Sequence, residues 1–79
     1  MYYLYILECS DKSLYTGITT NLARRVGEHN SGRLGAKYTN ARRPVKLVYS
    51  KGYKNRSTAS KEESRIKKLS RVQKLKLVN

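Results

Sequence analysis

The chain begins with two short apolar runs that are separated by turn-forming residues. The first run, residues 2–9, is rich in aromatic and branched side chains, and residues 10–13 (Ser-Asp-Lys-Ser) favour a turn. The second run, Leu-Tyr-Thr-Gly-Ile, follows at once from residue 14. This order predicts an antiparallel hairpin with strands over residues 2–9 and 14–19.

A helical spacing of apolar residues follows the hairpin. It predicts a helix over residues 21–30, with Thr20 as its cap and Leu22, Val26 and Ala23 on the buried side. The residues Asn-Ser-Gly at positions 30–32 are expected to end this helix.

The middle of the chain is basic and lightly apolar. We expect a short helical turn around residues 34–38 rather than a full helix. An alternating pattern then predicts a third strand over residues 45–50, with Pro44 at its start, where a missing backbone donor is tolerated. Gly52 is expected to end the strand.

The last third of the chain predicts a helix over residues 57–69. Ser57 or Ser60 can open it, and Ser60 with Glu63 forms a capping-box pattern. The residues expected on the helix face that carries Glu63 are Ala59, Ile66 and either Leu69 or Ser70.

Ser70 and Gln73 repeat the capping-box pattern and predict a final short helix. The residues expected on its apolar side are Val72, Leu75 and Val78. Residues 1–79 are therefore expected to form one α/β domain: a small three-stranded, mainly antiparallel sheet flanked by helices. The expected order is strand, strand, helix, short helix, strand, helix.

Cysteine and hydropathy patterns narrow the class of protein. Cys9 is the only cysteine, so an intramolecular disulfide is excluded and a thiolate-based structural zinc site lacks ligands. The sequence contains neither a run of ~18 apolar residues nor a recognisable export signal at its start. We therefore expect a cytoplasmic protein without a membrane partner.

Charge indicates the class of partner. The net charge is +13, and the whole excess lies in residues 33–79, a segment whose only acidic residues are Glu62 and Glu63. Such a distribution favours polyanions through steering and counterion release, which makes nucleic acid the leading partner. The alternatives are a solvated surface that maintains solubility and, less favoured, an anionic membrane surface.

Several side chains with useful chemistry are expected to meet. If the hairpin pairs residues whose numbers sum to an even value, Tyr5 and Tyr15 project from one face, and Gly17 leaves space beside the rings. Arg25 and His29 share one face of the first helix. With Glu63 from a later helix, the set supplies a base, a cation and an oxygen ligand for a hard metal.

Each of these residues also has an ordinary structural interpretation. The tyrosines can be packing residues, Arg25 a surface charge and His29 a solvated helix residue. Glu63 is spaced for a simple ion pair with Lys67 on the same helix.

The motifs together resemble the GIY-YIG nuclease superfamily, and in particular its small stand-alone bacterial proteins. The resemblance covers nearly the whole chain and rests on conserved spacing rather than on identical letters. The first triplet reads Tyr3-Leu4-Tyr5, and the second reads Tyr15-Thr16-Gly17. The later elements of the motif are Arg25, His29, the basic segment 35–39 and the segment 63–69.

This resemblance implies a metal-dependent endonuclease that hydrolyses phosphodiesters. Tyr15 would be the general base for the attacking water, and Tyr5 would orient that water or a phosphate oxygen. Arg25 would offset charge on the phosphate, and His29 would contact a phosphate or relay a proton. Glu63 would hold one divalent ion, Mg²⁺ by preference.

The expected partner is nucleic acid, with DNA favoured over RNA, and a separate targeting protein would supply specificity. Candidates for contacts with nucleic acid outside the site are Lys37, Arg42, Arg43, Lys46, Lys67, Lys68 and Arg71. The main rival is a basic nucleic-acid-binding module that does not cut, and a third alternative is a basic protein-interaction domain.

Overall fold

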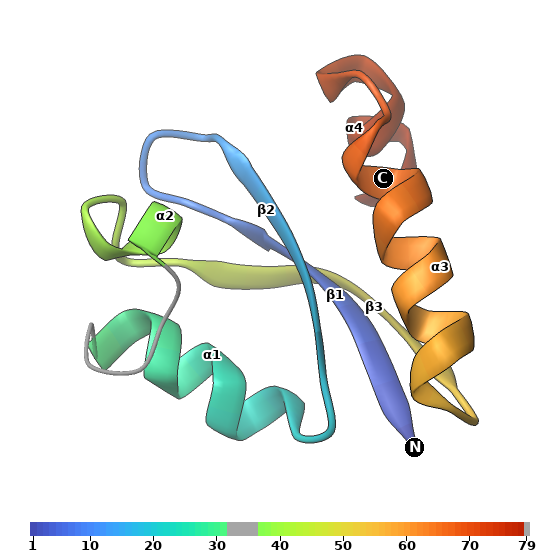
Figure 1. The fold of residues 1–79 in the computed structure, drawn as a ribbon. Helices are drawn as coiled ribbons and strands as arrows, with labels where there is room; N and C mark the ends of the chain where they lie inside the picture. Colours follow the sequence, from blue (N-terminus) through green and yellow to red (C-terminus); the bar gives the residue numbers. More distant parts are fainter. Residues whose placement is uncertain (32–36, 79) are drawn as a thin grey trace.

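The computed structural model describes residues 1–31 and 37–78, and it has the predicted α/β architecture (Figure 1). The three strands form one antiparallel sheet in the order β2-β1-β3. The elements in chain order are β1 (Tyr2–Glu8), β2 (Leu14–Thr19), α1 (Leu22–Ser31), α2 (Lys37–Asn40), β3 (Lys46–Tyr53), α3 (Arg56–Lys67) and α4 (Arg71–Val78).

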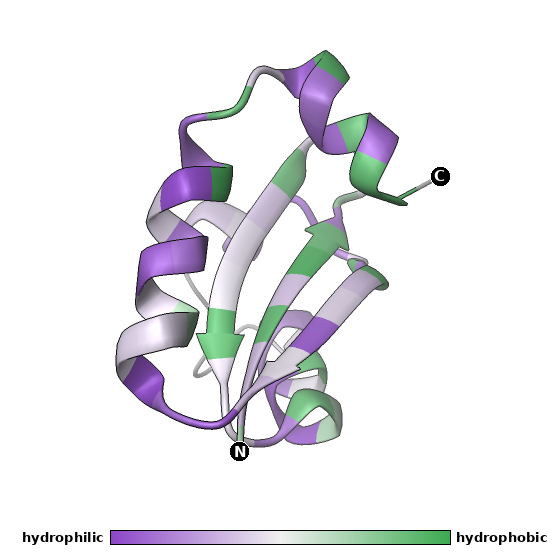
Figure 2. Ribbon diagram, turned by 90° about the vertical axis from the view of Figure 1, so that its right-hand side faces the viewer, coloured by the Kyte–Doolittle hydropathy of each residue, from purple (hydrophilic) through white to green (hydrophobic). Residues whose placement is uncertain are grey.

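The central strand β1 divides the core into two layers, because its side chains alternate between the faces of the sheet. Tyr5 and Leu7 belong to a cluster that packs against Leu22 and Val26 of α1. Leu4 and Ile6 belong to the other cluster, with Ile66 of α3 and the end of α4. Hydrophobic segments run along the strands, and polar segments dominate the helices (Figure 2). Helices α1 and α3 therefore cover opposite faces of the sheet.

The predicted hairpin register is confirmed. Tyr5 lies opposite Gly17 and Leu7 opposite Tyr15, so paired residue numbers sum to an even value. Tyr5 and Tyr15 consequently share the face that α1 covers.

The helix caps differ from the prediction at two positions. Asn21, not Thr20, caps α1, because its Oδ1 accepts a hydrogen bond from the Arg24 amide at 3.0 Å. Asn55 caps α3 by accepting from the Thr58 amide at 2.9 Å, so neither Ser57 nor Ser60 opens that helix. Asn is as good a cap as Ser or Thr, so composition alone did not decide between neighbouring candidates.

The predicted capping box before α4 is confirmed. The Ser70 amide donates to Gln73 Oε1 at 3.0 Å, and the Gln73 amide donates to Ser70 Oγ at 3.2 Å. The predicted apolar side of this helix is partly wrong, because Val72 is 64% exposed while Leu77 and Val78 pack on the sheet.

Three further local predictions need correction. Gly52 does not end β3, because it pairs with Tyr3 and the strand continues to Tyr53. Pro44 precedes β3 rather than starting it, and Ala23 is exposed on α1. The expected turn around residues 34–38 lies partly outside the described residues, and α2 covers 37–40.

None of the helices formed by residues 1–31 and 37–78 is both long and apolar enough to cross a membrane.

Candidate active site

The phenol of Tyr5 lies directly over Gly17 of the edge strand. A Cβ atom at residue 17 would be 2.6 Å from Tyr5 Oη and 2.7 Å from its Cζ, closer than real Cβ contacts allow. The absence of a side chain at Gly17 therefore lets a ring from the central strand reach across β2.

Two side chains of α1 converge on the hydroxyl of Tyr5. Arg25 Nε donates to Tyr5 Oη at 3.4 Å, and His29 Nε2 lies 3.0 Å from the same oxygen. His29 Nδ1 lies 2.8 Å from Thr39 Oγ1, which is completely buried in α2. A neutral imidazole with its proton on Nδ1 satisfies this whole chain: Tyr5 donates to Nε2 and Nδ1 donates to Thr39.

The guanidinium of Arg25 is fixed on both sides. Besides the contact with Tyr5, its Nη1 donates to Glu28 Oε1 at 2.9 Å. Burial alone would lower the pKa of Arg25, but the hydrogen bonds with Tyr5 and Glu28 outweigh burial and raise it. The side chain keeps 25% of its surface exposed, so a permanent positive charge is held in one place and remains accessible.

The pKa values of the Tyr5 hydroxyl and of the His29 imidazole are shifted in the directions that keep both groups uncharged. Burial raises the pKa of the Tyr5 hydroxyl, against the opposing hydrogen bond from Arg25. Burial also lowers the pKa of His29, and the charge of Arg25 lowers it further, while Glu28 acts in the opposite direction. Both side chains are therefore neutral near pH 7.

Tyr15 completes an aromatic group on this face. Its ring centroid lies 6.4 Å from that of Tyr5 and 5.1 Å from that of His29, the latter in an edge-to-face arrangement. Its other neighbour is Tyr38, which stacks on it with centroids 5.9 Å apart. Tyr15 is half-buried, so its ring is fixed by three neighbours without being sealed from solvent.

Glu63 reaches the group from another direction. It belongs to α3, which packs on the face of the sheet opposite Tyr15, so the residues that were expected to meet do not all lie on one face. Helix α3 lies alongside the edge strand β2 in both views (Figures 1 and 2), however. Burial is the main reason that the pKa of Tyr5 is raised, and the negative charge of Glu63 raises it further. A site that combined Glu63 with Tyr15 and Arg25 would therefore have to span the β2 edge.

The site offers few protein ligands for a metal ion. In the parts of the chain that the structure describes, no three His, Cys, Asp or Glu side chains gather into a metal-binding group. Mg²⁺, however, commonly binds proteins through one or two carboxylates and completes its shell with water and substrate phosphates. Glu63 is 22% exposed and has one partner cation, Lys67, at 3.4 Å, so a single accessible carboxylate fits such an ion. The simple helix ion pair that the spacing indicated is also present.

Burial divides the predicted site residues into two groups. Tyr5 is 1% exposed and His29 is 0% exposed, so neither side chain lies at the surface. His29 is also not the solvated helix residue that its position alone suggested. Tyr5 contacts both His29 and Arg25, whereas Tyr15, Arg25 and Glu63 retain exposed surface.

The predicted contact residues outside the site are dispersed. Arg42 packs over the Tyr38 ring at 4.2 Å and pairs with Asp11 at 3.0 Å, so it supports the local structure. Lys46 lies on β3, the edge strand opposite β2, and pairs with Glu8 at 3.4 Å. The candidates with exposed side chains elsewhere are Lys37, Arg43, Lys67, Lys68 and Arg71.

Three neighbours of the site were missed as functional residues. Thr39 and Tyr38 come from a segment without clear periodicity, and their contacts with His29 and Tyr15 cross long stretches of chain. Glu28 could have been recognised, because it is three residues after Arg25 on a helix.

Comparisons with known proteins agree with this geometry. A family model described as the GIY-YIG catalytic domain matches residues 1–76. The solution NMR structure of a UPF0213 protein from Bacillus halodurans gives a TM-score of 0.63 at 47% identity, covering 99% of this chain and 83% of that chain.

The chain therefore belongs to the GIY-YIG family, whose nuclease domains imply a nuclease-type function on nucleic acid. Within that family it is similar to small proteins named UPF0213. One from Syntrophus aciditrophicus is 58% identical over 76 residues, which are 96% of this chain and 87% of that protein. One from Natronomonas pharaonis is 51% identical over 77 residues, covering 98% of this chain and 89% of that protein.

Proposed function

We propose that this chain is a metal-dependent endonuclease that hydrolyses phosphodiester bonds in nucleic acid, with DNA favoured over RNA. The observation that carries the proposal is the immobilised guanidinium of Arg25, which the Tyr5 hydroxyl and Glu28 hold on the same face as Tyr15. A surface cation that served only solubility would have no reason to be anchored to a buried tyrosine.

Tyr15 and Arg25, which both retain exposed surface, have different roles in the reaction. Water attacks phosphorus, Tyr15 in its phenolate form accepts the proton of that water, the bond from phosphorus to the leaving oxygen breaks, and the leaving oxygen takes up a proton from bulk water. Arg25 offsets the negative charge that develops on the phosphate oxygens, for which a planar, permanently charged donor is well suited. Tyr5, His29 and Thr39 keep Arg25 in place and do not touch the substrate.

Nucleases of this family generally depend on a divalent metal. Glu63 would hold the ion, Mg²⁺ by preference, which supplies further stabilisation of charge on the phosphate oxygens.

The test is a cleavage assay on single-stranded, duplex, nicked and branched DNA and RNA, with Mg²⁺, Mn²⁺ or chelator. Arg25→Ala should lower the rate by ~10²-fold or more, because one charge contact in the transition state is lost. Tyr15→Phe should impair cleavage with little change in binding, and Glu63→Gln should weaken the metal dependence.

The neighbouring residues provide matched controls. Arg24→Ala removes the same charge from an adjacent, 62% exposed position, and Glu62→Gln removes a carboxylate that pairs with Arg65. Both variants should cleave at the wild-type rate. Cleavage that resists chelator, or that Arg25→Ala and Arg24→Ala affect equally, would contradict the proposal. Tight binding without cleavage of any substrate would favour the non-cutting binding module instead.

A further inference from the structure

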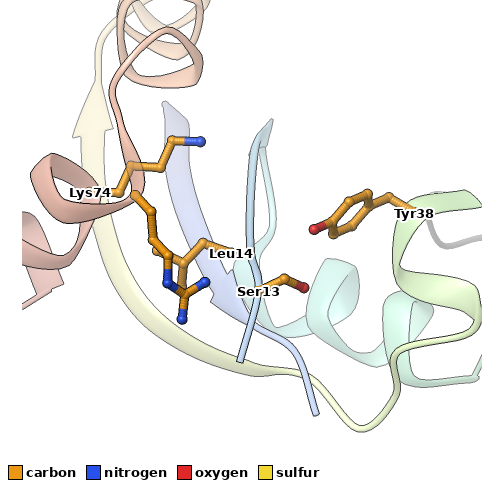
Figure 3. A pocket seen from close by; sticks show the side chains of 5 residues that line it. Ser13, Leu14, Tyr38 and Lys74 are labelled. Carbon is orange, nitrogen blue, oxygen red and sulfur yellow. The ribbon is translucent and has the colours of Figure 1, made fainter. Parts of the chain in front are cut away.

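A pocket of about 190 Å³ lies beside the candidate active site, where the start of β2 meets α2 and α4. The residues that line it are Ser13, Leu14, Tyr38, Arg71 and Lys74. The hydroxyl groups of Ser13 and Tyr38 point toward one another, and Leu14 and Lys74 lie on the other side of the strand (Figure 3). The pocket therefore spans the same β2 edge as the candidate site, closer to the beginning of the strand.

The polar groups of this pocket suit an anion. Arg71 and Lys74 bring two positive charges, and none of the five lining residues is acidic. Arg71 Nη2 donates to the Lys12 carbonyl at 2.7 Å, which orients the guanidinium before a ligand arrives and lowers the entropy lost on binding. The adjacent carboxylate of Asp11 is engaged by the amide and the hydroxyl of Ser13, at 3.0 and 2.5 Å, and by Arg42 at 3.0 Å.

Tyr38 connects this pocket to the candidate site. Its ring stacks on Tyr15, and Arg42 lies over it at 4.2 Å, so its hydroxyl is fixed relative to Tyr15. From Ser13 to Tyr15 the strand rises by roughly 7 Å at ~3.3 Å per residue. A nucleic-acid strand that follows this edge covers that length in about two steps, at ~3.4 Å per nucleotide of a B-form strand.

We propose that this pocket binds a phosphate group of the nucleic-acid substrate, a few nucleotides away from the phosphodiester presented to Tyr15 and Arg25. Arg71 and Lys74 neutralise the phosphate, and the hydroxyl of Tyr38 offers it a hydrogen bond. The subsite rests on the proposed function only in taking nucleic acid as the ligand. It gives α4 a role in binding the substrate.

The experiment measures binding of the full chain to a short oligonucleotide in chelator, so that its result does not depend on cleavage. Single phosphates along the oligonucleotide are replaced one at a time by neutral methylphosphonates. We expect one internal position at which the wild type loses about tenfold or more in affinity, and the double variant Arg71→Ala/Lys74→Ala should lose nothing further there. The double variant should also reduce the salt slope by roughly 1 to 2. Comparing an oligonucleotide that carries a 5′-phosphate with one that carries a 5′-hydroxyl shows whether the pocket binds a terminal phosphate.

Lys76→Ala is the matched control, because it removes one charge from an exposed position of α4 outside the pocket. It should preserve the wild-type sensitivity at each methylphosphonate position. Two results would overturn the subsite. One is a double variant that loses affinity at the same methylphosphonate position as the wild type. The other is a double variant whose change in affinity equals that of Lys76→Ala. Loss of cleavage with this binding pattern intact would refute the nuclease proposal alone, and absence of nucleic-acid binding would refute both.

Discussion

Replacing Gly17 by Ala tests whether the close approach of Tyr5 organises the site. The added Cβ would lie 2.6 Å from Tyr5 Oη, and ordinary contacts begin at 3.4 Å, so the ring must move by about 0.8 Å. The ring cannot move freely, because Tyr5 is 1% exposed and bonded to His29 at 3.0 Å. We expect Gly17→Ala to lower the free energy of unfolding by ~1–3 kcal/mol, the usual cost of overpacking a core.

The same displacement should affect catalysis, because the contact from Arg25 Nε to Tyr5 is already 3.4 Å long. A shift of this size would break that contact and release the guanidinium, so cleavage should fall by ~10²-fold, as misplacement of a catalytic group does. Urea unfolding and the cleavage assay measure the two effects separately.

Gly27 provides the control for Gly17. It lies in the middle of α1, and a Cβ there would meet nothing within 4 Å. Gly27→Ala should therefore stabilise the protein by ~0.5–1 kcal/mol, because the helix loses a flexible residue. Wild-type stability for Gly17→Ala, or equal effects of the two substitutions, would refute the steric reasoning.

Two further predictions concern buried polar groups. The Thr16 hydroxyl is buried and has no hydrogen-bond partner among the described residues, so Thr16→Val should raise the free energy of urea unfolding by ~1–2 kcal/mol; a loss of stability would contradict this. Burial and then the charge of Arg25 hold the folded-state pKa of His29 below 6.5, so the unfolded chain binds the proton more readily. The stability that neutral His29 provides is present above pH 6.5 and is lost as the pH falls through the folded-state pKa. The free energy of unfolding should therefore decline below pH 6.5 in the wild type but not in His29→Gln.

The sequence predicted the face on which a side chain lies where that face follows from the period of its strand or helix. Once the hairpin pairs residues whose numbers sum to an even value, the period of two along each strand places Tyr5 and Tyr15 on one face. The spacing of Arg25 and His29 placed both on one side of α1, and both meet the Tyr5 hydroxyl.

What the sequence could not predict depends on contacts between distant segments. Whether His29 is solvated or buried is decided by Thr39 and the β-sheet, not by the helix that carries it. The stacking of Tyr38 on Tyr15 likewise joins α2 to β2. Local patterns contain no information about such pairs, so the distinction between exposed chemical groups and buried supporting groups required the structure.

The position of the site follows from the small size of the sheet. With three strands, each face is covered by helices, and side chains from both faces can meet only around an edge. Tyr5 belongs to the central strand, yet its hydroxyl reaches that edge because Gly17 has no side chain in the way. The ring thereby links the buried His29 with the accessible Arg25. In a domain of this size, the absence of a side chain at Gly17 thus allows a residue of the packed core to support an accessible site.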